Sequence, residues 1–134
     1  MIPAYNSSLT NVMGTRTPLS KAHKMDIDGD VINGHCCELD AMKQIIYKIL
    51  NTERYNHVIY SWNYGIELQD LFGKPMDYVG LELKRRISEA LLQDNRIISV
   101  TDFEFDVSTR RTVKVMFTVN TIYGDVKSER MVNV

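Results

Sequence analysis

The sequence TVKVMFTVNTIY, residues 112–123, alternates apolar and polar side chains. A β-strand has this period because successive side chains point to opposite faces of a sheet. The apolar face holds Val113, Val115, Phe117, Val119 and Tyr123, and the polar face holds Thr112, Lys114, Thr118 and Asn120. The stretch therefore predicts a half-buried strand in the centre of a sheet.

The residues before this strand have the same period. The segment FEFDV, residues 103–107, alternates apolar with acidic side chains, and residues 108–111 supply a connecting turn. Ile98 and Val100 fall in the opposite phase of the alternation. An extra residue in one strand shifts the phase in this way. We therefore expect a bulge or break near Thr101–Asp102.

Further strands are expected at both ends of the chain. Residues 126–134 predict a last strand, after a turn at Gly124–Asp125. Residues 24–33 predict a hairpin around Asp28-Gly29, a dipeptide typical of tight turns. Residues 1–22 carry Pro3 and Pro18 among serine, threonine and asparagine, and predict an extended arm that orders only against something else.

Two amphipathic helices lie between the hairpin and the last strands. Leu39, Met42, Ile45, Ile46, Ile49 and Leu50 recur at helical spacing over 38–52. A second helix, capped by Asp77 and ending near Asp94, has an apolar stripe of Val79, Leu83, Ile87, Ala90 and Leu91. The predicted fold is α+β: one small domain, residues 23–134, with two main helices packed on one side of an antiparallel or mixed sheet.

The composition limits the kinds of partner. Sixteen basic and seventeen acidic residues give a net charge of −1, so neither nucleic acid nor a membrane is an expected partner. The apolar runs are too short to span a bilayer. The first residues lack the basic segment followed by an apolar segment that is typical of a signal peptide. We therefore expect the protein in a soluble compartment. Cys36 and Cys37 are adjacent and are expected to be free thiols in a reducing cytosol.

The sequence gives little support for a metal site or a catalytic site. A calcium loop starting at Asp26 would have Val31 at the glycine position and Cys37 at the glutamate position. His35-Cys36-Cys37 lacks the spacing of a zinc site and the signature of a nucleophile. The two catalytic carboxyl groups of a glycosidase would have to come from the acidic residues around the second helix, and no local pattern marks such a pair. These residues are Glu67, Asp70, Asp77, Glu82 and Glu89. No cofactor, metal or catalytic residue is therefore expected.

Three segments together resemble one family. They are AMKQIIYKILNTERYNHVIYSWNYGIEL (41–68), RRISEALLQDNRI (85–97) and FTVNTIYGD (117–125). They are similar to the baseplate wedge or sheath-initiator proteins of contractile phage tails and phage-tail-like particles, particularly the PBSX-type prophage branch. The likeness covers residues 24–126.

The resemblance implies a structural role in the baseplate of a virion or phage-tail-like particle assembled in a bacterial cytoplasm. It implies a sheath-like strand-exchange domain that docks on the wedge and templates the first sheath ring by strand addition. Sheath protein and wedge proteins are the implied partners, with tube or hub proteins as further ones and six as the expected copy number. The family's historical label, lysozyme-like, makes a peptidoglycan-degrading baseplate hydrolase the alternative.

The resemblance also points to particular residues. In the family, a Glu-Pro-Arg motif at the end of the helix before the sheet docks onto the wedge, and the corresponding residues here are Asp94-Asn95-Arg96. Arg96 is thus either a solvated cation at a helix end or a docking anchor. In the last strand, backbone groups near Lys127 and Glu129 are expected to pair with the sheath.

The segment IYSWNYG, residues 59–65, holds the only tryptophan of the chain. If the segment were a strand, its three aromatic side chains would share one face. So small a domain cannot bury all three. We therefore expect Trp62 in the core and at least one of Tyr60 and Tyr64 at the rim of a protein contact.

Overall fold

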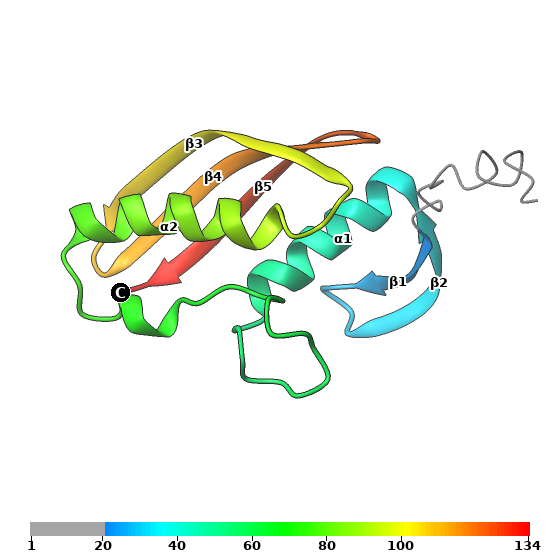
Figure 1. Cartoon of the computed structure of the whole chain (residues 1–134), viewed down its shortest axis with the longest axis horizontal. Helices are drawn as coiled ribbons and strands as arrows, with labels where there is room; N and C mark the ends of the chain where they lie inside the picture. Colours follow the sequence, from blue (N-terminus) through cyan, green and yellow to red (C-terminus); the bar gives the residue numbers. More distant parts are fainter. Residues whose placement is uncertain (1–20) are drawn as a thin grey trace, which may run out of the picture.

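The computed structural model describes residues 21–134, which form two antiparallel sheets and two α-helices (Figure 1). The strands are β1 (Lys21–Asp26), β2 (Val31–Cys37), β3 (Ile97–Thr109), β4 (Thr112–Thr121) and β5 (Gly124–Asn133). The helices are α1 (Glu38–Asn51), α2 (Met76–Leu91) and the short 3-10 helix η2 (Gln69–Leu71). The predicted α+β class is confirmed.

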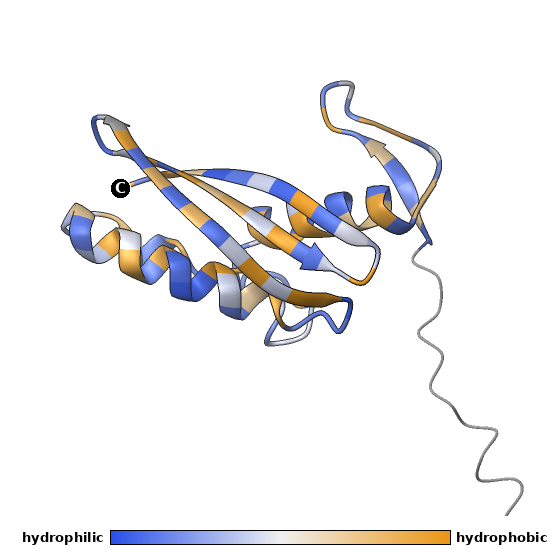
Figure 2. Cartoon of the chain, turned by 90° about the horizontal axis from the view of Figure 1, so that it is seen from above, coloured by the Kyte–Doolittle hydropathy of each residue, from blue (hydrophilic) through white to orange (hydrophobic). Residues whose placement is uncertain are grey.

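The three-stranded sheet has the order β3-β4-β5, with β4 in the centre. The residues that β4 turns towards the helices are buried: Val113, Val115, Phe117, Val119 and Thr121. Figure 2 shows the resulting alternation of hydrophobic and hydrophilic residues along the strands. Helix α1 contacts β5, and α2 contacts β3 and α1. The two helices therefore cover one face of this sheet and close the core.

The apolar stripes of both helices are in the core as predicted. In α1, Met42, Ile46, Ile49 and Leu50 are buried, and in α2 the stripe from Val79 to Leu91 is buried. The predicted cap of α2 is wrong. Pro75 occupies the cap position with φ −58°, so the helix begins at Met76 and Asp77 lies in its first turn. The helix ends at Leu91, three residues before Asp94.

The hairpin predicted over 24–33 is confirmed and is longer than expected. Strands β1 and β2 pair from Lys21–Cys37 to Asp26–Val31 and form a separate sheet. The hairpin lies beside α1, on the side away from the three-stranded sheet (Figure 1). Residues 21 and 22 of the expected arm belong to β1, and the rest of that arm lies outside the described residues.

The break predicted in the strand before β4 is confirmed. The pairing of β3 with β4 shifts between Thr101 and Glu104, where Asp102 has φ +55°. The turn before β5 differs from the prediction. Its two loop residues are Ile122 and Tyr123, because Thr121 pairs with Gly124. The Thr121 hydroxyl also donates to the carbonyl of Gly124 at 2.7 Å, which closes the turn.

Candidate functional site

The long connection between α1 and η2 is fastened at its base. The carboxylate of Glu53 accepts hydrogen bonds from the backbone N–H groups of Leu68 and Gln69, at 3.0 and 3.2 Å. Arg54 donates to the carbonyl of Gly65. Gly65 has φ +94°, and a Cβ there would lie 2.6 Å from the carbonyl oxygen of Thr52. Because both ends are joined, the connection between them projects as a closed loop.

The tip of this loop is apolar and exposed. Val58 and Ile59 are 103% and 86% exposed, and Trp62 is 75% exposed. The prediction that Trp62 lies in the core is therefore wrong. The segment is not a strand, because Tyr60 and Tyr64 make turn hydrogen bonds to the carbonyls of residues three positions earlier. Strand alternation thus does not apply, and aliphatic side chains of the helices and β4 fill the core.

The two predicted tyrosines form a stacked pair. Their ring centroids are 4.4 Å apart. Tyr60 is exposed at the surface, whereas Tyr64 is half-buried and packs against the core. Burial, the nearby Tyr60 and the charge of Asp94 raise the pKa of Tyr64, in that order of importance. Tyr64 and Asp94 are therefore near enough for the charge of Asp94 to act on the tyrosine.

Asp94 and Arg96 form an ion pair in the turn between α2 and β3. The Arg96 guanidinium donates to the Asp94 carboxylate at 2.6 Å, and the Arg96 backbone N–H donates to the same carboxylate at 2.9 Å. The hydrogen bond from Arg96 lowers the pKa of Asp94. The Arg96 side chain is 26% exposed and follows the end of α2 by five residues. Arg96 is therefore not a solvated cation at a helix end.

The structure brings four of the six predicted residues into one region. The Asn63 amide donates to the side chain of Gln93 at 3.0 Å, which joins the loop to the turn that carries Asp94. The backbone N–H of Ile122 donates to the carbonyl of Arg96, which joins that turn to the β4–β5 turn. We call this region the aromatic surface; it comprises residues 57–64, Asp94 and Arg96.

The other two predicted residues, Lys127 and Glu129, lie on β5 at an edge of the sheet. Strand β5 pairs only with β4 among the described strands. In an antiparallel pair, every second residue directs its backbone N–H and C=O groups to the partner strand, and the residues between them direct these groups away from it. Two observations show which residues of β5 direct their backbone groups to β4. Thr121 pairs with Gly124 across a two-residue turn. The Val134 N–H donates a hydrogen bond to the Arg111 carbonyl. Even-numbered residues of β5 therefore bond to β4, and odd-numbered residues face outwards.

The two edges of the sheet differ in regularity. The pairing of β3 shifts register at three places along the strand. Bulges of this kind blunt an edge against further pairing. The pairing of β5 runs without a shift over ten residue pairs, from Thr112–Asn133 to Thr121–Gly124. Strand β5 is thus the edge that presents an uninterrupted row of outward N–H and C=O groups.

A groove runs beside the β5 edge, which sequence reasoning did not find. It has a volume of about 500 Å³ and lies between residues 126–131 and one side of α1. Ile27 of the β1–β2 turn and Tyr47 and Leu50 of α1 contribute apolar lining. These residues are distant in sequence, so only the helical spacing of Tyr47 and Leu50 could have suggested a shared face.

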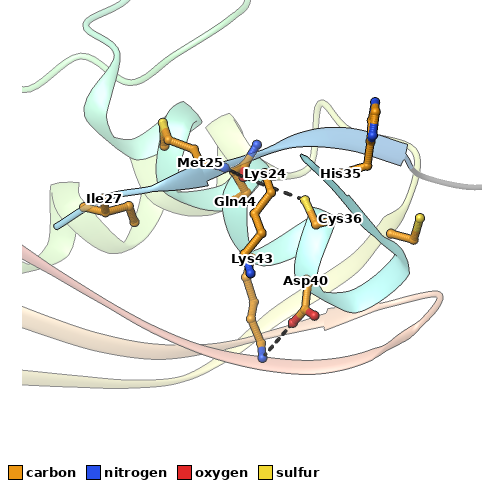
Figure 3. Close-up of a pocket in the computed structure, with 9 residues that line it drawn as sticks. Lys24, Met25, Ile27, His35, Cys36, Asp40, Lys43 and Gln44 are labelled. Carbon is orange, nitrogen blue, oxygen red and sulfur yellow. Dashed lines mark hydrogen bonds and ion pairs between the residues drawn. The ribbon is translucent and has the colours of Figure 1, made fainter. Parts of the chain in front are cut away.

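The hairpin is held on α1 by a buried amide. The Gln44 side chain, shown with Met25 in Figure 3, accepts from the Met25 N–H at 2.9 Å. It also donates to the His23 carbonyl at 2.7 Å. Cys36 and Cys37 are free thiols, as expected. The Cys36 thiol donates to the Ala22 carbonyl at 3.7 Å, so it packs within the hairpin. The Gln44 amide thus fixes the position of the hairpin relative to α1.

The carboxylates around α2 serve ion pairs. Asp70 and Glu82 both bind Arg86, and Glu82 also binds Arg85. The hydrogen bond from Arg86 lowers the pKa of Asp70, and those from Arg85 and Arg86 lower the pKa of Glu82. A glycosidase acid needs the opposite shift, produced by an apolar pocket. These two carboxyl groups are therefore unsuited to be the acid of a hydrolase.

The described residues, 21–134, contain neither a metal-binding cluster nor a membrane-spanning helix. No group of three or more histidine, cysteine, aspartate or glutamate residues in this part of the chain could hold a metal ion. No helix within it has the length and apolar character needed to cross a membrane. The aromatic surface and the β5 edge are both suited to protein contacts.

An α+β domain with a free sheet edge and an exposed aromatic loop is suited to assembly with other proteins. The family of contractile injection system sheath initiators matches residues 18–124, and the chain belongs to this family. The chain is 38% identical over 117 residues to the phage-like element PBSX protein XkdS of Bacillus subtilis (strain 168), covering 84% of this chain and 82% of that relative. Membership of a family of structural components implies a non-enzymatic role in a contractile particle.

Proposed function

We propose that this protein starts the sheath of a phage-like contractile particle by accepting a strand of the sheath protein at the β5 edge. The observation that carries the proposal is the outward row of backbone groups along β5, which no register shift interrupts. An added strand gains a ladder of hydrogen bonds at such an edge with little reorganisation. The adjacent groove offers apolar contacts to alternate side chains of that strand.

We further propose that the aromatic surface binds the wedge proteins of the baseplate. Its exposed loop tip and partly buried ion pair have the composition of an interface centre, in which aromatic residues and arginine are enriched. In this arrangement the wedge holds the protein in the baseplate, six copies surround the tube, and tube or hub proteins are neighbours. The β5 edges of the six copies then receive the first sheath ring.

A proline at Lys127 tests strand addition in a purified system. Lys127 faces outwards, so Lys127→Pro removes one donor from the edge and leaves the β4 ladder intact. We expect at least a tenfold loss of affinity for purified sheath protein, measured by calorimetry. Lys127→Ala keeps the donor and removes the charge, and it should bind within twofold of the unmodified protein. Equal affinity of a folded Lys127→Pro variant would exclude strand addition at this position.

Arg96→Ala tests docking on the wedge. The ion pair with Asp94 is partly exposed, so its loss should cost the fold about 1 kcal/mol or less. Loss of an arginine buried in an interface costs the complex about 2–5 kcal/mol. We therefore expect a nearly normal melting temperature and at least a tenfold lower recovery in purified baseplates. Arg110→Ala, in the exposed β3–β4 turn, is the matched control and should incorporate normally. Normal incorporation of Arg96→Ala would remove Arg96 from the docking site.

A further inference from the structure

Arg130 of β5 differs from the other half-buried arginines in its partner. Arg54, Arg86 and Arg96 each form an ion pair with a carboxylate. The Arg130 guanidinium instead binds the neutral side-chain oxygen of Asn51. Its Nε is buried and has no hydrogen-bond partner among the described residues. Such donors are rare in proteins, because an unpaired one loses its hydration without compensation. Arg130 can therefore take a further partner from outside the domain.

The acid next to Arg130 in the sequence already has another partner. Successive side chains of a strand point to opposite faces, so Glu129 lies on the other face of the sheet. There its carboxylate binds Lys114 at 2.8 Å. Arg130 binds Asn51 through Nη1 and not through Nε. The Nε side of a guanidinium is one through which arginine binds a carboxylate with two parallel hydrogen bonds. The unpaired side of Arg130 is thus suited to an acidic group.

The groove beside β5 brings Arg130 close to the free edge. Arg130 and the buried Val132 lie on the face of β5 that is turned towards the helices. Helix α1 runs along this face. Near its start, the side chain of Leu39 lies 3.7 Å from the position that a Cβ on Gly124 would take. At its end, Asn51 binds Arg130. The groove between α1 and β5 therefore follows the edge and includes Arg130 in its lining.

A strand added to the β5 edge directs every second side chain into this groove. Directly opposite residues of adjacent strands have Cβ atoms about 5 Å apart. The side chain opposite Arg130 is thus within reach of the guanidinium, and interface side chains commonly change rotamer on binding. The side chain opposite Ser128, two positions along, lies nearer the middle of α1. In that part of the groove Tyr47 and Ile27 contribute apolar lining.

We propose that the sheath strand carries an acidic residue that pairs with Arg130, and an apolar residue two positions away that packs in the groove. This inference rests on the proposed strand addition at β5. A carboxylate supplies two acceptors and the opposite charge, so it compensates the buried guanidinium better than a neutral side chain does. Backbone pairing alone accepts any extended segment, and pockets for alternate side chains give specificity. Arg130 thus makes the edge selective for the sheath strand.

Calorimetry with the purified sheath protein tests this pairing. Arg130→Gln removes the charge and keeps a polar side chain, and we expect at least a tenfold loss of affinity. Added salt should weaken binding of the unmodified protein more steeply than binding of this variant. Asn51→Ala is the matched control, because it removes the internal partner of Arg130 and keeps the guanidinium. It should bind within twofold of the unmodified protein. Equal losses in both variants would mean that Arg130 only holds β5 on α1, which would overturn the pairing.

Variants of the sheath protein identify the acidic partner. Each acidic residue of the sheath protein is replaced in turn by its amide, asparagine or glutamine. One replacement should lower the affinity as much as Arg130→Gln does and have no further effect on that variant. If Arg130→Gln does not fold, these replacements are measured on the unmodified protein, and the absence of any that lowers the affinity tenfold would overturn the proposal.

The Lys127 variants distinguish the failure of this inference from the failure of strand addition. If Arg130→Gln binds as tightly as the unmodified protein while Lys127→Pro does not, the pairing with Arg130 is wrong and strand addition stands. A loss in Arg130→Gln that no replacement in the sheath protein reproduces would also overturn the pairing. If both variants bind normally, or if the unmodified protein does not bind the sheath protein, strand addition at β5 is wrong and the pairing with it.

Discussion

Particles assembled with Glu129→Pro should contain baseplate and tube but no attached sheath. Glu129 is an outward residue near the middle of the β5 edge, so the proline interrupts the proposed ladder between this protein and the first sheath strand. The β4 ladder and the aromatic surface remain unchanged, so the variant still enters the baseplate. Electron microscopy of particles purified from a strain that carries only this variant gives the fraction with sheath. We expect this fraction to fall at least tenfold.

Two matched variants distinguish the loss of an outward backbone donor from the loss of the Glu129 side chain and from misfolding. Glu129→Ala removes the same ion pair with Lys114, a 2.8 Å contact between exposed side chains, and should give normal sheaths. Ser128→Pro removes a donor from the bonded pair with Phe117, and we expect it to destabilise the domain and be lost from particles. If Glu129→Pro itself does not fold, Lys127→Pro takes its place in particles. Full-length contractile sheaths on a folded proline variant would show that another edge receives the sheath.

The parts of the fold that could be predicted from the sequence are those with a local cause. The alternation over residues 112–123 predicted β4, since half-burial of a strand imposes a period of two, although the strand ends at Thr121 and Tyr123 lies in the following turn. The opposite phase of Val100 and Phe103 predicted the bulge between them, because an extra residue reverses the phase. The buried stripe of α2 was likewise visible in the spacing from Val79 to Leu91.

The parts that could not be predicted depend on contacts between distant segments. The position of Trp62 follows from the closure of its loop by Glu53 and Gly65, and no local pattern indicates that closure. The Asp94–Arg96 pair is short-range in sequence, but its place beside Tyr64 depends on how the loop folds back onto α2. The groove at β5 is lined by α1 and by Ile27 of the β1–β2 turn, which are distant from the last strand in sequence.

The two proposed interfaces are connected through one turn. Arg96 of the aromatic surface accepts a hydrogen bond from Ile122 through its carbonyl, and β5 begins two residues after Ile122. A protein bound at the aromatic surface therefore fixes the orientation of the β5 edge through a few backbone bonds. This connection supports the proposal that wedge docking determines the direction in which the first sheath strand is added.

The largest loss of fold stability should come from Leu83→Ala. Leu83 is completely buried in the stripe of α2, between the helix and the three-stranded sheet. Truncation of a buried leucine removes apolar burial and leaves a cavity, which together cost about 3 kcal/mol. For a domain of this size that loss lowers the melting temperature by about 10 °C. Urea denaturation followed by circular dichroism measures the free energy of unfolding directly.

Leu81→Ala is the matched control, because Leu81 lies on the same helix and is 75% exposed. Its free energy of unfolding should change by less than about 0.5 kcal/mol, as for most surface substitutions. Neither leucine belongs to the aromatic surface or the β5 edge. A Leu83→Ala variant that remains folded at low temperature should therefore still bind the sheath protein, whereas Lys127→Pro should fold and fail to bind. If both leucine variants lost stability equally, α2 would pack on the sheet through a different face, and the groove and edge geometry derived from this packing would need revision.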